Sequence, residues 1–176
     1  MTTSQSRMTK RWQKSIVTMA VAILATATFM SCFQYTAYFR YCSTESEGWN
    51  RFDFLEYRVP AIVQEGYYVE EIGIRYDERY PYRQLGLVID QTVVHTASKR
   101  MGRYKSDTLR VDLYDEDGKP RGEGANLKLL VIPLKSVKLE QGDSLSVRIR
   151  HNMKKTTVKG VSAIGLKVTF SMPSGD

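Results

Sequence analysis

Hydrophobic and polar residues alternate with a period of two through most of the chain after Trp49. In the segment 108–115, Leu109, Val111 and Leu113 alternate with polar or charged neighbours. This alternation is typical of a strand with one buried face. The same pattern predicts strands at 52–59, 69–76, 85–94, 108–115, 144–151 and 164–170.

Turn-forming residues separate these segments, as at Asp117-Gly118 and Lys159-Gly160. The segment 124–139 is ambiguous because Pro133 interrupts it, and we expect an irregular strand, a bend and a short strand at 136–139. No stretch after Trp49 keeps a helical period with caps. The sequence therefore predicts an all-β fold, an antiparallel β-sandwich of about seven to eight strands over residues 49–173.

The chain begins with a basic and then apolar segment. The first fifteen residues carry four positive charges and no acid, and residues 15–31 carry no charge. The stretch FMSC, in which Ser31 precedes Cys32, resembles a bacterial lipobox with Phe29 at the usual leucine position. We therefore expect a lipoprotein signal peptide at 1–31 and acyl chains such as palmitate on Cys32.

Two other interpretations of this segment remain open. An uncleaved N-terminal anchor would leave Cys32 as an ordinary interfacial residue. A disulfide between Cys32 and Cys42 is compatible with an oxidising compartment. Residues 32–48 have no clean period and are expected to form a tether between the lipid and the folded domain.

Charge and composition limit the classes of function. The chain has a net charge of +7, but its first 31 residues supply four of these charges, so the remainder is only +3. This balance argues against a dedicated nucleic-acid binder. Two basic clusters, at 99–105 and 148–155, suit solvated surfaces, or a patch that faces anionic headgroups or an acidic partner.

No motif indicates catalysis, a cofactor or a metal. The segment DLYDEDG at 112–118 lacks the EF-hand ligands, and a hairpin turn at 116–119 explains it better. His95 is expected at the solvated surface, and His151 is expected to continue the outward series of Arg148 and Arg150. The chain has neither a Gly-x-Ser-x-Gly turn nor a phosphate-binding loop. We therefore expect a protein that is not an enzyme.

Aromatic residues give the one candidate binding surface. Tyr80 and Tyr82 flank Pro81, and Trp49 lies where the tether meets the first predicted strand. Packing of these rings at a sheet end is one interpretation. The other is an exposed surface for a sugar or a protein, because Tyr and Trp dominate binding hot spots.

The order of motifs resembles the gliding-motility lipoprotein GldH family of Bacteroidota. The resemblance rests on the lipobox-like cysteine, Gly48-Trp49, YPYRQLGLVI, DTLRVDLYDEDGKPRGEG, a late RHNM and the terminal GVSAIGLKV. It implies membrane-attached work in the cell envelope, connected in gliding relatives with motility and secretion, and it supplies no catalytic residues. The residues after Cys32 lack an acidic cluster of the surface-export type, which favours the periplasmic face of the outer membrane.

These observations predict a non-catalytic structural or adaptor component of an envelope assembly, with other envelope proteins as partners. The alternative is a membrane-anchored glycan-binding module that uses Trp49, Tyr80 and Tyr82. A hydrolase would need two carboxylates brought together by folding.

Overall fold

The computed structural model describes residues 35–95 and 100–171, which fold as strands joined by turns and loops. Within these ranges there is no helix that is long and apolar enough to cross a membrane. The strands of the described ranges are β1 (Thr36–Ser43), β2 (Trp49–Asn50), β3 (Leu55–Val59), β4 (Gly66–Tyr76), β5 (Gln84–His95), β6 (Arg100–Asp112), β7 (Lys128–Pro133), β8 (Val137–Leu139), β9 (Asp143–His151), β10 (Thr157–Val158) and β11 (Val161–Ser171).

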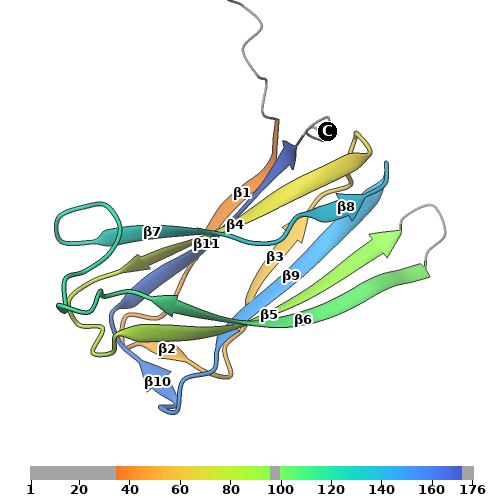
Figure 1. Ribbon diagram of the computed structural model, residues 1–176. Helices are drawn as coiled ribbons and strands as arrows, with labels where there is room; N and C mark the ends of the chain where they lie inside the picture. The colour runs from red at the N-terminus through yellow and green to blue at the C-terminus, as the bar shows by residue number, and fades with distance from the viewer. Residues whose placement is uncertain (1–34, 96–99, 172–176) are drawn as a thin grey trace, which may run out of the picture. The chain divides into compact units, whose positions relative to one another are not determined.

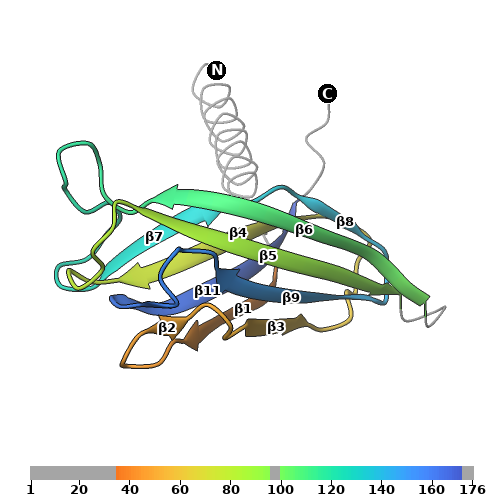
Figure 2. The ribbon, with the colours of Figure 1, turned by 90° about the horizontal axis from the view of Figure 1, so that it is seen from below.

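The strands form two main antiparallel sheets and a short ribbon. One sheet has the order β1-β11-β4-β7, and β8 continues beyond β7 along the same side of β4. The other sheet has the order β3-β9-β5-β6, and β2 pairs with β10 in the ribbon. Figures 1 and 2 show the two sheets as facing layers. The prediction of an all-β antiparallel sandwich is confirmed, although the number of strands is larger than predicted.

The core lies between the sheets and is built from the alternating residues. Leu85, Leu87 and Ile89 of β5 face Ile72 and Ile74 of β4 across this layer, and all five are buried. The strand at 85–94 is central, between β9 and β6, as its apolar run predicts. The hydroxyl of Tyr57 in β3 donates to the carbonyl oxygen of Ile164 in β11, at 2.7 Å, and so links the two sheets.

The prediction that residues 32–48 form a tether is wrong for β1. Thr36–Ser43 pairs with β11 along most of its length, from Thr36 opposite Thr169 to Ser43 opposite Ala163. Its alternation is obscured because β1 is an edge strand with aromatic residues toward both faces. A bulge near its start also shifts the register.

The ring of Tyr41 in β1 packs over two glycines of the neighbouring strands. Gly165 of β11 lies opposite both Gly73 of β4 and Tyr41 of β1. A Cβ atom on Gly165 would lie 2.5 Å from the Tyr41 ring, and one on Gly73 would lie 2.2 Å from its hydroxyl oxygen. The Arg75 guanidinium stacks over the same ring at 4.0 Å from its centroid. The ring therefore covers a strip of sheet that lacks side chains of its own.

The expectation that His151 faces outward is wrong, because it continues the inward series of Leu145, Val147 and Ile149 in β9. Its Nε2 lies 3.0 Å from the carbonyl oxygen of Trp49, and its Nδ1 accepts from the N–H of Met153 at 3.3 Å. These partners require the neutral tautomer with the proton on Nε2. Burial lowers the pKa of His151 below its ordinary value.

This burial predicts a pH-dependent loss of stability. Below about pH 6.5 the unfolded chain protonates this histidine while the folded protein resists the proton. The free energy of unfolding should therefore fall as the pH decreases from 7.5 to 5.5, and it should fall less in His151→Gln. Urea unfolding of both proteins at the two pH values measures the difference, and contributions of other groups cancel in it. Equal pH dependence in the two proteins would show that His151 is not buried as a neutral group.

Candidate functional site

Three loops meet at one end of the sandwich. They are the turn after β4 (77–83), the connection from β6 to β7 (113–127) and the turn between β10 and β11 (159–160). Val161 at the start of β11 pairs with Tyr76, whereas Thr169 near its other end pairs with Thr36. The three loops, which we call the loop end, therefore lie at the opposite end of β11 from the start of β1, as Figure 1 shows.

Gly160 fixes the turn after β4. Its φ of +80° is the left-handed conformation that favours glycine. Its carbonyl oxygen accepts the N–H of Asp77 at 2.8 Å. A Cβ atom at this position would lie 2.1 Å from the backbone nitrogen of Tyr80. Only glycine allows the two turns to pack this closely.

Two tyrosines anchor the long connection to β4. The hydroxyl of Tyr76 lies 2.5 Å from the carbonyl oxygen of Leu113 and 2.6 Å from that of Arg121, so its one proton serves two acceptors. Burial raises the pKa of Tyr76 and keeps it a donor. Tyr114 packs edge-on against Tyr76, with ring centroids 5.7 Å apart, and donates to the carbonyl oxygen of Tyr80 at 3.3 Å.

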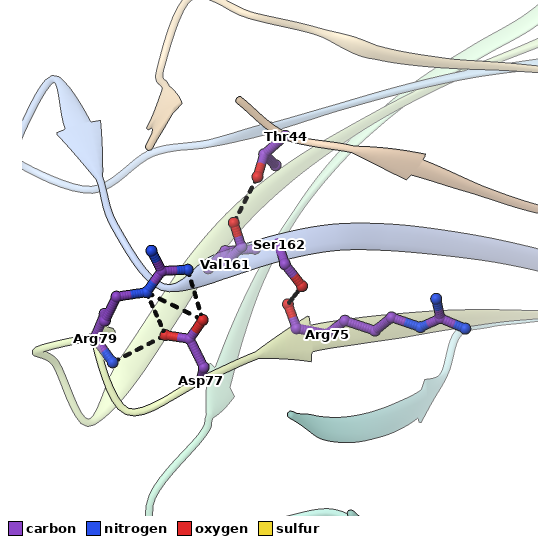
Figure 3. A network of polar contacts seen from close by, with 6 residues as sticks. All are labelled: Thr44, Arg75, Asp77, Arg79, Val161 and Ser162. Carbon is purple, nitrogen blue, oxygen red and sulfur yellow. Dashed lines mark hydrogen bonds and ion pairs between the residues drawn. The ribbon is translucent and has the colours of Figure 1, made fainter. Parts of the chain in front are cut away.

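An ion pair sits at the rim of the loop end (Figure 3). Asp77 and Arg79 pair in a bidentate manner, with Nη2–Oδ2 at 2.7 Å and Nε–Oδ1 at 3.0 Å, and Oδ1 also accepts the N–H of Arg79. The hydrogen bonds from Arg79 hold the pKa of Asp77 below its ordinary value. Figure 3 also shows Thr44, which donates to the carbonyl oxygen of Val161 at 2.5 Å and ties the end of β1 to this region.

The acidic segment DLYDEDG forms the expected tight turn. The Oδ1 atom of Asp115 accepts the N–H groups of Asp117 and Lys119, at 3.0 and 2.8 Å. Gly118 has a φ of +77°, and Tyr114 bridges Pro120 across the turn. Asp115 thus stabilises its own backbone, as Asp often does in turns.

The end of β4 with the turn after it and the connection from β6 to β7 line a cavity of about 790 Å³ that opens to solvent. Its lining combines aromatic, charged and apolar side chains, with Leu127 44% exposed. The lining residues are Tyr76, Asp77, Glu78, Arg79, Tyr114, Pro120, Ala125, Asn126, Leu127 and Lys128. Such a mixture suits recognition of a polypeptide surface more than a small apolar ligand.

Three charged side chains of the cavity, Asp77, Arg79 and Lys128, are bound to other groups of the fold. Arg79 occupies both oxygens of Asp77 and holds the pKa of this carboxyl below its ordinary value. Lys128 donates through Nζ to the carbonyl oxygen of Gly124. In residues 35–95 and 100–171 no three His, Cys, Asp or Glu side chains are grouped so as to hold a metal ion.

The predicted aromatic set does not form one exposed surface. Trp49 is 1% exposed, donates from its indole N–H to the carbonyl oxygen of Asp53 at 3.0 Å and packs edge-on against His151. Tyr80 is 2% exposed and donates to the carbonyl oxygen of Gln84 at 2.8 Å. Tyr82 is half-buried and packs edge-on against Tyr80. The glycan-binding interpretation therefore loses Trp49 and Tyr80, because each uses its polar atom inside the fold.

Cys32, the predicted site of lipid attachment, lies outside the described residues. Cys42 is half-buried in β1, and its thiol lies 3.8 Å from the carbonyl oxygen of Glu56. The signal segment and the alternatives of an anchor or a disulfide with Cys32 remain predictions.

His95 and residues of both basic clusters make contacts within the fold that the sequence did not predict. His95 is partly exposed, but its Nδ1 lies 2.7 Å from Oδ1 of the buried Asp143. Arg148 stacks on Phe54 at 4.0 Å from the ring centroid and pairs with Glu56 at 3.4 Å. Arg103 bridges β6 to β8 by donating to the carbonyl oxygen of Lys138 at 3.2 Å.

Sequence reasoning missed most of the cavity. Asp77, Glu78 and Arg79 precede a proline turn and are adjacent in sequence, but Asn126 and Leu127 are almost fifty residues away. One signal was available, namely the absence of alternation between Asp115 and Leu127, which indicates a long connection. Long connections of this kind often carry function.

Comparisons with solved structures give only distant likenesses. The chain is similar to the hydrolase SACOL2612 of the CocE/NonD family from Staphylococcus aureus, with 12% identity, a TM-score of 0.41 and coverage of 77% of this chain and 33% of that one. It is similar to an aminopeptidase from a marine sediment Thaumarchaeota archaeon, with 15% identity, a TM-score of 0.36 and coverage of 68% and 24%. It is also similar to Eiger TNF from S. frugiperda, with 14% identity, a TM-score of 0.32 and coverage of 81% and 91%.

The chain spans about a third of the length of the hydrolase and about a quarter of the length of the aminopeptidase. All three TM-scores are below 0.5, so none of these likenesses indicates a function for this protein. A search of curated proteins finds no match. The model of the GldH lipoprotein family, in contrast, matches residues 36–168, from the first strand to the last. This chain belongs to the GldH lipoprotein family.

Proposed function

We propose that this protein is a non-catalytic adaptor, lipid-anchored through Cys32, in an envelope assembly for motility or secretion. Its place would be the periplasmic face of the outer membrane. Family membership supports a membrane-anchored envelope lipoprotein. In this proposal the loop end is the surface that contacts another protein of the assembly.

The observation that carries the proposal is the position of the cavity along β11. The eleven residues of β11 span about 35 Å at the rise of an extended strand. Cys32 is three residues before Tyr35 and four before Thr36, a stretch that reaches at most about 14 Å. An acyl group on Cys32 would thus hold the start of β1 near the bilayer, and the loop end would point away from it.

The anchor makes a direct prediction. Cys32→Ala removes the sulfur that takes the lipid, so the protein should leave the membrane fraction or retain its signal segment with changed mobility. Fractionation of cells and metabolic labelling with a palmitate analogue measure both effects. If the variant stays in the membrane with the same mobility as the wild type, the anchor is not a lipid on Cys32.

The docking surface makes a second prediction. Leu127→Asp places a charge on a large exposed apolar residue of the cavity, and the recovery of a co-purified envelope protein should drop by about tenfold, as at an interface hot spot. The measurement is quantitative mass spectrometry of the full chain purified from its own membranes in mild detergent.

Val63→Asp provides the matched control. Val63 is 66% exposed and follows Ile62, whose N–H donates to the carbonyl oxygen of Asp143 at the opposite end of the sandwich. This variant should retain the partner at the wild-type level. Equal losses in both variants, or no loss in Leu127→Asp, would remove the loop end from the proposal.

A further inference from the structure

A second site lies between β6 and the segment that joins β7 to β8, where polar residues occupy positions that face the core. On β5 the inward series runs from Leu85 and Leu87 through Ile89 to Gln91. On β6 the residue opposite Gln91 is Lys105, whereas Val111, opposite Leu85, is buried. Charged residues at core-facing positions break the pattern that specifies a sandwich, and such breaks mark functional sites.

Glu70 is the deepest of these residues. It lies in β4, is 1% exposed and receives a hydrogen bond from Nε2 of Gln91 to its Oε2 at 2.6 Å. Its Oε1 is buried and has no partner among residues 35–95 and 100–171. Leaving a carboxyl oxygen buried without a partner is costly, which calls for a reason. Burial raises the pKa of Glu70, in agreement with this cost.

The groove above Glu70 is open and basic. Two adjoining cavities, of about 320 and 380 Å³, share Gln91, Lys105 and Lys135 in their linings. Glu70 lines the first cavity, and Arg103 and Lys138 line the second. The chain bends after Pro133, and the N–H of Leu134 donates to the carbonyl oxygen of Glu70 at 2.7 Å. The residues of this bend, Leu134 and Lys135, line the first cavity opposite Lys105 and Asp107 of β6.

Asp107, which lines the groove, and Glu65, which lies outside it, only partly balance these cations. Lys105 pairs with Asp107 at 2.5 Å, and Lys138 pairs with Glu65 at 3.5 Å. Arg103 and Lys135 have no carboxylate partner within 4.0 Å among the described residues. A ligand that fits must therefore bring negative charge to the rim and a hydrogen-bond donor to the buried carboxyl oxygen.

We propose that this groove binds a phosphoethanolamine group, with its ammonium on Oε1 of Glu70 and its phosphate on Lys135, Lys105 and Arg103. Burial disfavours the charged form of Glu70. An ammonium on Oε1 opposes this effect, because it brings positive charge and N–H donors, and charge-assisted hydrogen bonds of this kind are stronger than neutral ones. The groove lies toward the end of the sandwich at which β1 begins, since Glu70 pairs with Val168 and Val168 pairs with Tyr38. A headgroup at a membrane surface could reach it there.

The test uses the full chain in detergent and isothermal titration with O-phosphoethanolamine. We expect saturable binding at one site, and about tenfold weaker binding in Glu70→Gln and in Lys135→Gln. Phosphocholine, which keeps the positive charge but has no N–H donor, should bind the wild type about tenfold more weakly than phosphoethanolamine does and should lose less affinity in Glu70→Gln.

Each control removes one charge of the same sign as the test variant does, but from a residue that does not line the groove. Glu71→Gln alters the next residue of β4, which pairs with Lys167 at 2.9 Å, and Arg110→Gln alters an exposed residue of β6. Both should bind as the wild type does, and urea midpoints should confirm that all variants fold. No saturable binding of phosphoethanolamine, or equal binding by wild type and Glu70→Gln, would overturn the proposal.

A short-chain phosphatidylethanolamine distinguishes the source of the group. Tighter binding than that of soluble phosphoethanolamine would assign the site to a membrane lipid. Equal binding would assign it to phosphoethanolamine on a soluble or glycan carrier. Either result, together with the loss in Glu70→Gln, supports the recognition chemistry proposed here.

Discussion

Val111→Asp should leave the protein largely unfolded or insoluble. Val111 is 3% exposed in β6, opposite Leu85 of β5, and faces the layer between the sheets. An aspartate at this position would bury a charge without a partner at a cost of several kcal/mol. The total stability of a domain of this size is about 5–15 kcal/mol, so one such substitution removes most of it.

Asp112→Ala is the control one residue away. Asp112 lies on the other face of β6, where it accepts from Nε2 of Gln84 at 2.8 Å near Arg83. Its loss should change the free energy of unfolding by about 1 kcal/mol or less. Urea midpoints of the full chain, followed by tryptophan fluorescence, to which buried Trp49 contributes, compare the two variants. Equal midpoints would mean that β6 does not present one face to the core.

Gly160→Ala should destabilise the loop end by about 2–4 kcal/mol, through two effects that add. A left-handed φ of +80° costs a side-chain-bearing residue about 1–2 kcal/mol. The new Cβ atom would lie 2.1 Å from the nitrogen of Tyr80 and 2.6 Å from the carbonyl carbon of Arg79. Both are backbone atoms, so the turn itself must move, and the Asp77–Arg79 pair at the cavity rim moves with it.

Gly118→Ala separates these two effects. Gly118 has nearly the same φ, +77°, but no atom lies within 4 Å of the position of its Cβ. This variant should lose only the backbone term of about 1–2 kcal/mol. Urea midpoints of the two alanine variants decide the matter. A loss in Gly160→Ala no larger than that in Gly118→Ala would show that the two turns are not packed closely.

The strands that the sequence predicts are those with one face buried and one exposed. Val111 and Leu113 are buried as their alternation predicts, and Leu109 is partly buried and packs against the core. In contrast, β1 escaped prediction because Phe39 and Tyr41 lie on an edge strand, and Tyr41 covers a glycine pair that is distant in sequence. Alternation of apolar and polar residues predicts a strand with one buried face, and it does not appear where both faces of a strand are partly covered.

The candidate sites were harder to predict because they depend on contacts between distant segments. Tyr80 and Trp49 have the composition of a binding surface, yet the carbonyl oxygens that satisfy their polar atoms become visible only in the fold. Likewise, only the fold shows that Gln91 of the other sheet bonds Oε2 of Glu70 and that Oε1 has no partner among the described residues. A single sequence contains the residues of such sites without showing which of them meet.

The central claim, that the loop end contacts another envelope protein, is tested most directly by site-specific photocrosslinking in living cells. A photoreactive amino acid at Asn126, in the cavity lining, should give one discrete crosslinked species that contains one envelope protein. The same amino acid at Val63, at the opposite end of the sandwich, should not give this species. No crosslinked species from Asn126, or the same species from both positions, would contradict the account.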